Sequence, residues 1–139
     1  MFVEMLNDHY EEWLKILHFK HAKILQSKNT LKGIDVAFVE GAITSPGMIK
    51  ELRAIRRHAK RVVAIGSCAV QGMPAAQRNN FNEKTQQEIA FLIDRFNQLP
   101  KVLTVKDVVQ VDYEVPGCPM DETAFLETLQ KCLQEFHLA

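Results

Sequence analysis

Three cysteines carry the side chains best suited to metal or redox chemistry in this sequence: Cys68, Cys118 and Cys132. Such a small, odd number argues against a disulfide framework and predicts free thiols. Cys68 and Cys118 each follow a glycine, Gly66 or Gly117, by no more than two residues. A free cysteine is also often buried as a small apolar residue. Cys132 fits that interpretation, because it falls in the apolar stripe of the last predicted helix, so Cys68 and Cys118 are the candidate ligands.

The loops around these two cysteines have the properties of a soft-metal site. Glycine lets the backbone approach a bound group closely and direct N–H groups at it, and N–H groups directed at sulfur help to set an iron–sulfur potential. Pro116 and Pro119 restrict the loop around Cys118. A thiolate at the start of a helix is also favoured by the helix dipole. These features predict a metal or redox role for Cys68 and Cys118.

The elements that must position these loops follow from the apolar periodicity. Alternating and continuous apolar runs predict strands over residues 22–25, 34–39, 61–65 and 108–115. Helical spacing predicts helices over about 1–18, 48–55, 83–96 and 121–136, with Asn80 and Glu83 as a capping box and Asp121 as a cap. This order predicts one domain over residues 1–139, a flavodoxin-like, doubly wound parallel α/β sheet. Such folds normally open with a strand, whereas this chain opens with a helix.

Three loops of interest follow predicted strands. They contain Glu40 and Gly41, then Gly66 and Cys68, and finally Gly117 and Cys118. Ligands of open α/β sheets bind beyond the carboxyl ends of the strands, where these loops must lie. The loop after Gly66 also suggests a phosphate cradle for a flavin, but it lacks the hydroxyl residues and glycine spacing of such loops, so a flavin has no support.

Composition narrows the class of protein. Lys and Arg number 17, as do Asp and Glu, so the formal net charge is zero and a nucleic-acid partner is not expected. Hydrophobic residues make up 47% of the 139 residues, enough for a packed core. Apolar runs fall far short of the roughly 20 residues that cross a membrane, and no signal peptide is recognisable. We therefore expect a cytoplasmic protein without a membrane span.

Three segments together resemble a known family. They are the run from Asp35 to Gly41 (DVAFVEG), the loop from Gly66 to Gly72 (GSCAVQG) and the segment from Val111 to Pro119 (VDYEVPGCP). They resemble the small, electron-transferring subunit of nickel–iron hydrogenases, in its short single-cluster form, and the related 20 kDa subunit of respiratory complex I. The VDY before PGCP is closer to the soluble, cofactor-linked hydrogenases.

The resemblance implies a non-catalytic electron relay. Members hold a 4Fe-4S cluster with four cysteines and face a catalytic large subunit, alongside further electron-transfer subunits. Cys68 matches the third ligand and Cys118 the fourth, with Gly66 and Gly117 shaping their loops. Glu40, followed by Gly41, matches an acidic position near the subunit interface.

One departure from the family pattern is serious. The Cys-x-x-Cys pair that supplies the first two ligands is absent, because no cysteine precedes Cys68. Two explanations compete: truncation before the first strand, which we favour, or natural loss of the cluster. The first predicts an electron-transfer subunit. The second predicts a cluster-free interaction or structural module on the same scaffold, and a complex I type subunit is a third reading.

Overall fold

The strand β2 (Ala59–Ile65) forms the centre of the sheet and is its most buried element. In this computed structural model, which describes residues 2–23 and 25–137 with side chains from Met5 onward, β2 pairs in parallel with β1 (Ile34–Glu40) and β3 (Tyr113–Val115). The described strands follow the order β1-β2-β3. The expected open, parallel α/β sheet is therefore confirmed.

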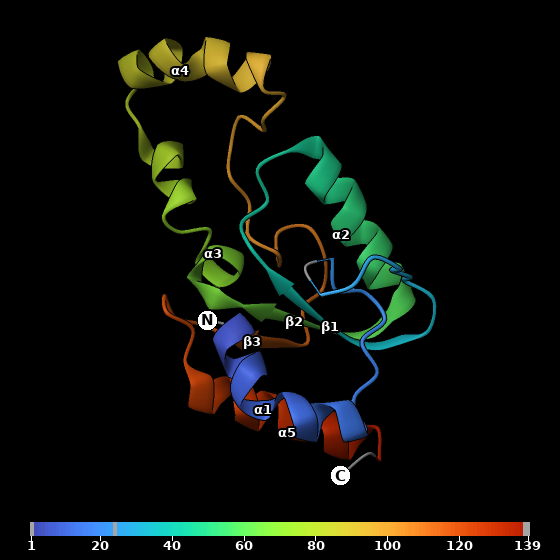
Figure 1. Ribbon diagram of the computed structural model, residues 1–139. Coiled ribbons are helices and arrows are strands. Elements are labelled where there is room, and N and C mark those ends of the chain that lie inside the picture. Colours follow the sequence, from blue (N-terminus) through green and yellow to red (C-terminus); the bar gives the residue numbers. More distant parts are fainter. Residues whose placement is uncertain (1, 24, 138–139) are drawn as a thin grey trace.

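Helices cover both faces of this sheet (Figure 1). α2 (Pro46–His58) lies on one face, and α1 (Phe2–Ile16) and α5 (Glu122–Glu135) lie side by side on the other. The remaining helical elements are α3 (Gly66–Gln71), the 3-10 helix η1 (Ala75–Asn80) and α4 (Glu83–Arg95). The alternation of strand and helix along the chain explains why consecutive strands are parallel, because each helix carries the chain back to the same end of the sheet.

Each face of the sheet has its own apolar core. Against α1 and α5, the ring of Phe125 packs on Trp13, with ring centroids 6.1 Å apart, and on Phe38, at 5.1 Å. Against α2, Leu52 packs with Val62 and Val105. Both cores need apolar side chains from β2, which explains the continuous apolar run Val62–Ile65.

Helices α4 and α5 each begin at a side-chain cap, and one of the two predicted caps is corrected. Asp121 caps α5 as expected, its carboxylate accepting from Ala124 N at 2.7 Å. α4 is capped by Asn82, which accepts from Thr85 N at 2.9 Å, so the prediction of Asn80 as the cap was wrong. A cap residue needs extended backbone, which Asn82 has, whereas Asn80 still belongs to η1.

Two predicted strands are also corrected. Residues 22, 23 and 25 form a turn, in which Leu25 N donates to Ala22 O at 2.9 Å; Ile24 lies outside the described residues. The strand expected over 108–115 begins only at Tyr113, since Val108 N and Val109 N both donate to Val105 O in a turn. The valines of that turn pack against the α2 core instead of pairing with a strand.

α4 stands away from the sheet (Figure 1) and buries none of its described residues. The apolar residues at helical spacing that predicted this helix include Leu92 and, just after the helix, Phe96, and both are exposed. Ile89 and Ile93 are only partly buried. The periodicity identified the helix correctly, but not what the helix packs against.

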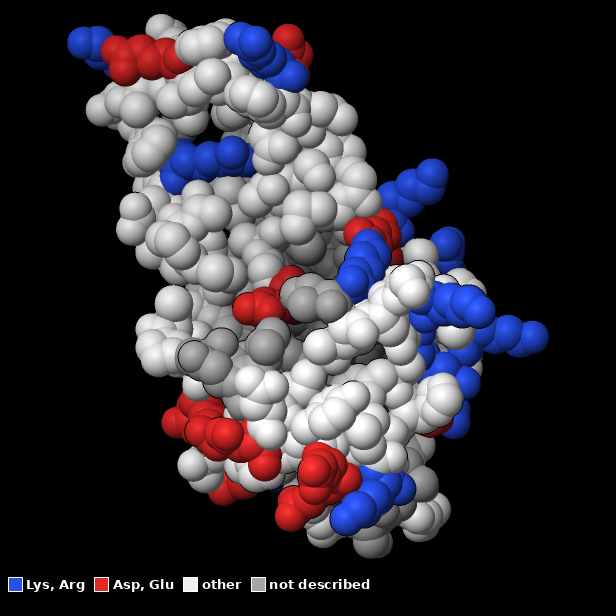
Figure 2. Space-filling view, viewed as in Figure 1, with Lys and Arg blue, Asp and Glu red and all other residues white. Residues whose placement is uncertain are grey.

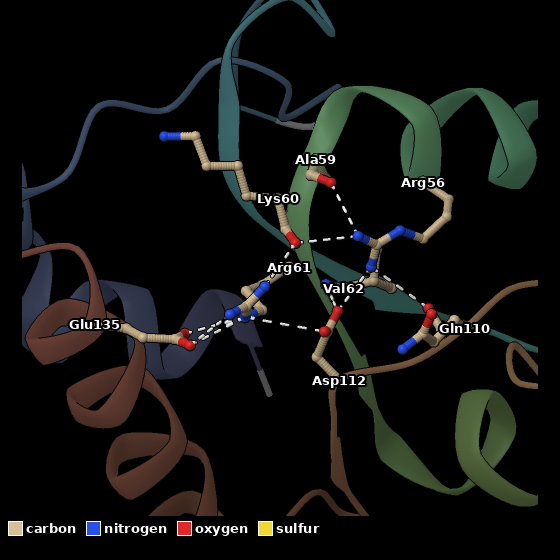
Figure 3. Close-up of polar contacts among 8 residues, drawn as sticks. All are labelled: Arg56, Ala59, Lys60, Arg61, Val62, Gln110, Asp112 and Glu135. Carbon is tan, nitrogen blue, oxygen red and sulfur yellow. Dashed lines mark hydrogen bonds and ion pairs between the residues drawn. The ribbon is translucent and has the colours of Figure 1, made fainter.

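A polar network ties the amino ends of β2 and β3 together (Figure 3). The Asp112 carboxylate accepts from Arg56 Nη1 at 2.7 Å and from Val62 N at 2.8 Å. Arg56 also donates to the carbonyls of Ala59 and Lys60, at 3.2 and 3.0 Å. The network joins the end of α2 to β2 and to the residue before β3. It therefore holds β3 in place at the amino end of the sheet, which lies opposite to the two cysteines.

None of the helices described in residues 2–23 and 25–137 is long and apolar enough to span a membrane.

Candidate functional site

The two cysteine loops meet at the carboxyl edge of the sheet. β2 and β3 end in register, with Ile65 opposite Val115, and each cysteine loop follows one of these residues. Ser67 N donates to Gly117 O at 2.9 Å, which joins the two loops through their backbones. The segment after β2, expected as a loop, is the short helix α3, so Cys68 lies in the first turn of a helix. The structure thus brings the start of α3 and the Cys118 loop side by side.

Both glycines of this site adopt backbone angles that favour glycine. Gly66 has φ +80° and Gly117 has φ +115°. A Cβ on Gly117 would lie 2.5 Å from Pro119 O and 3.0 Å from Asp121 N, far inside contact distance. The tight loop around Cys118 therefore depends on the missing side chain of Gly117.

Glu40 and Gly41 lie at the same edge of the sheet. Glu40 is the last residue of β1 and pairs with Ile65, the residue directly before Gly66. The Glu40 side chain is exposed. Gly41 has φ +95°, and a Cβ there would meet nothing within 4 Å. All six residues selected from the sequence are thus at the ends of neighbouring strands.

The three thiols differ in their surroundings. Cys118 is exposed and Cys68 is half-buried at the carboxyl edge, whereas Cys132 is only 2% exposed within the core beneath α5. Burial, together with the nearby charge of Glu135, raises the pKa of the Cys132 thiol. Cys132 is therefore an apolar core residue, as its helical position predicted.

These surroundings predict the order of thiol alkylation in the folded chain when no cluster is bound. With iodoacetamide, we expect Cys118 to react fastest, Cys68 more slowly and Cys132 at least tenfold more slowly than Cys118, because thiolate formation and access both fall with burial. Mass spectrometry of peptides at timed intervals measures the three rates. Denatured protein, in which all three should react alike, is the control, and rapid native labelling of Cys132 would contradict the assignment.

The described residues do not complete the ligand set of a 4Fe-4S cluster. Such a cluster is held by four cysteine thiolates, and the carboxyl edge offers Cys68 and Cys118. Within residues 2–23 and 25–137, no group of three or more His, Cys, Asp or Glu side chains is placed to hold a metal ion. The two loops have the chemistry of thiolate ligands, but the described chain alone does not fit the whole cluster.

Comparison with protein families gives a match over almost the entire chain. The family model described as the 20 kDa subunit of NADH ubiquinone oxidoreductase matches residues 2–132. That range contains Cys68, Cys118 and all the buried residues of both cores except Leu133.

Several relatives are hydrogenase subunits. The chain is 31% identical over 110 residues to the NAD-reducing hydrogenase HoxS subunit delta of Cupriavidus necator, and the match covers 68% of this chain and 53% of the relative. It is 29% identical over 124 residues to the sulfhydrogenase 2 subunit delta of Pyrococcus furiosus, covering 86% and 52%. The chain thus spans about half the length of the curated relatives it matches.

A solved structure shares the fold. A chain in the crystal structure of an NAD⁺-reducing [NiFe]-hydrogenase in the H2-reduced state superposes with a TM-score of 0.77 at 25% identity. The superposition covers 95% of this chain and 83% of that one.

Proposed function

Since this chain belongs to the family of the 20 kDa subunit of NADH ubiquinone oxidoreductase, we propose that it is an electron-transfer subunit of a hydrogenase complex. The observation that carries the proposal is the Ser67 N to Gly117 O hydrogen bond, because it joins two cysteine loops at one edge of the sheet. In this role the chain performs no bond chemistry. It works beside a catalytic large subunit and further electron-transfer subunits, and its free thiols suit the reducing cytoplasm.

Cys68 and Cys118 would each supply one thiolate to an iron–sulfur cluster, which transfers single electrons when bound. Since a Cys₄ site needs two more thiolates than this edge provides, the remaining ligands must come from outside the described residues. Gly117 holds the Cys118 loop in its tight turn, and Gly66 begins α3, the short helix that carries Cys68. Glu40, exposed at the same edge, is placed to meet a partner subunit.

The ligand count also supports a second candidate function. A chain whose described residues form no group of three metal ligands could serve as a cluster-free interaction module on the same scaffold. In that case Cys68 and Cys118 would be remnants, and the carboxyl edge would contact a partner through Glu40 and its neighbouring loops.

Metal analysis distinguishes the two functions. We expect protein isolated anaerobically with its partner subunits to hold about four irons, with matching acid-labile sulfide, beyond those of the same partner subunits isolated without this chain. The variants Cys68→Ser and Cys118→Ser should each lose most of this iron, whereas Cys132→Ala should retain it, because Cys132 lies in the core. Iron no higher in the intact complex than in the partner subunits without this chain would refute the electron-transfer role and favour the interaction module.

A further inference from the structure

The exposed side of α2 carries a row of positive charges without partners. Lys50, Arg53 and Arg57 follow one another at intervals of three and four residues, which places them on one face of the helix. All three residues are exposed, and none forms an ion pair within the part of the chain that the structure describes. We call these three residues the α2 basic face.

The acidic residues near α2 do not neutralise this face. Glu51, the acidic residue of α2 itself, forms its ion pair with Lys23. Asp35, at the start of β1, forms its ion pair with Lys60 at 2.7 Å. Glu40 ends β1 and forms no printed ion pair with the α2 basic face among the described residues. The positive charge of the α2 basic face is therefore available to a partner.

The charges of the whole molecule are segregated. The formal net charge is zero, but Figure 2 shows Lys and Arg side chains gathered on the flank where α2 lies in Figure 1. Asp and Glu side chains lie mainly around α1 and α5, on the other face of the sheet. A surface with one sign of charge attracts partners of the opposite sign and orients them during encounter.

Folding of α2 does not account for the row of charges. Like charges three or four residues apart repel on a helix surface, as Lys50 and Arg53 do, and Arg53 and Arg57. The helix dipole favours Arg57 in the last turn, but it does not favour Lys50 or Arg53, which lie outside that turn. The α2 basic face therefore opposes the stability of its own helix, which is expected of a surface that binds an anionic partner.

The composition of α2 favours a protein as this partner. Proteins that bind single-stranded nucleic acids stack the bases on aromatic rings, and helices that lie on membranes present large apolar side chains to the lipid. α2 contains no Phe, Tyr or Trp. Among the described residues, none of the exposed large hydrophobic side chains belongs to α2. Carboxylates on a protein surface require neither feature.

The spacing of the charges matches a helix on the partner. Intervals of three and four residues separate the charges by about 4.5 and 6 Å along the axis of α2, whereas residues on one face of a strand recur about every 6.8 Å. A helix that lies antiparallel to α2 reads these intervals in reverse. It faces all three cations when it carries carboxylates at positions i, i+4 and i+7.

We propose that the α2 basic face binds an acidic helix of a partner protein, with one carboxylate opposite each of Lys50, Arg53 and Arg57. Exposed ion pairs each contribute little affinity, so the face acts mainly by attracting and orienting the partner. The proposal goes beyond the proposed function and does not depend on a cluster.

Titration of the full chain with a defined probe tests the proposal. The probe is a stapled helical peptide of alanine and glutamine with glutamates at i, i+4 and i+7. We expect the amide NMR signals of residues 46–58 to shift, and the dissociation constant to rise at least tenfold between about 20 and about 500 mM NaCl. A peptide of the same composition with glutamates at i, i+2 and i+5, which point to different sides of the helix, should bind at least fivefold more weakly.

Two matched variants locate the binding site. Arg53→Glu should weaken binding of the probe at least tenfold. It should not lower the unfolding temperature, because it replaces two repulsive pairs, with Lys50 and Arg57, by two attractive ones. Lys84→Glu makes the same change of charge at an exposed residue of α4 and should leave binding within twofold of the parent protein.

Three results would overturn the proposal. The first is equal binding of the two peptides, or binding that Arg53→Glu does not weaken. The second is tighter binding, at the same salt concentration, of phosphatidylserine vesicles or of a single-stranded oligonucleotide, which would assign the face to a membrane or a nucleic acid. The third is self-association in sedimentation at low salt that Arg53→Glu abolishes. That result would assign the face to the exposed acidic residues of α1, Asp8, Glu11 and Glu12, in a second copy of this chain.

Discussion

Replacing Gly117 by alanine should destabilise the protein by roughly 2–4 kcal/mol, because the new side chain meets main-chain atoms that cannot move independently. The backbone at Gly117 has φ +115°, and a Cβ would approach Pro119 O to 2.5 Å and Asp121 N to 3.0 Å. Asp121 caps α5, so a shift of this loop is transmitted to the start of that helix. Urea unfolding of the purified chain, followed by circular dichroism, measures the loss.

Gly41→Ala is the matched control for this prediction. Gly41 also has a left-handed backbone, with φ +95°, but a Cβ there would meet nothing within 4 Å. Its substitution should cost only the backbone strain, about 1–2 kcal/mol. If the two variants lost equal stability, the close approach of backbone to Gly117 would not be the reason for glycine at that position.

Removing the Asp112 carboxylate should produce the other large effect, a loss of about 2–3 kcal/mol in Asp112→Ala. The side chain of Asp112 is only 17% exposed, and it accepts from Val62 N and from Arg56. Its loss leaves a buried N–H of β2 and much of a half-buried guanidinium without their partner (Figure 3). Thermal or urea unfolding measures the change.

Glu135→Gln provides the control for Asp112, because the Glu135 carboxylate also bonds an arginine, Arg61 at 2.7 Å, but lies more exposed. Exposed ion pairs contribute little to stability, so this variant should remain close to the parent protein. A loss as large as that of Asp112→Ala would show that charge alone, without burial, accounts for the network.

The Asp112 network should also appear in the pH dependence of stability. Burial acts to raise the pKa of Asp112, but hydrogen bonds from Val62 N and Arg56, with the charges of Arg56 and Arg61, outweigh it and lower the pKa below 3.8. Since the folded-state pKa is depressed, the stabilisation is present above the unfolded pKa and is lost as the pH falls through the folded one. The stability difference between the parent and Asp112→Ala should therefore be constant above about pH 5 and shrink in more acidic solution. A difference independent of pH would contradict this account.

The fold was predictable where a local rule and the tertiary structure agree. The helix cap at Asp121 and the strand ends before Gly66 and Pro116 follow from residue type and periodicity alone. The alternating valines before Tyr113 misled the analysis, because a turn that packs valines on the α2 core has the same pattern as a half-buried strand. Periodicity records that a side chain is buried, but not the element that buries it.

The candidate site was predictable for a different reason. Parallel strands place their carboxyl ends at one edge, so the Cys68 and Cys118 loops had to lie on the same side once both were assigned to strand ends. No role was predicted for Asp112 from the sequence, although an acidic residue within a valine-rich stretch was a signal for one.

The hydrogen bonds that join the two ends of the segment carrying α4 have a consequence for how this chain can evolve. The Asn79 side chain donates to Val102 O and accepts from Val102 N, each at 2.8 Å, and Arg78 bonds Leu99 O at 2.7 Å. These contacts join the chain before α4 to the chain after it, and α4 itself buries none of its described residues. Doubling the length of a loop closed in this way costs only about 0.6 kcal/mol in closure entropy. Insertions and deletions in the family should therefore gather between residues 80 and 98, where new segments can be acquired without altering the sheet.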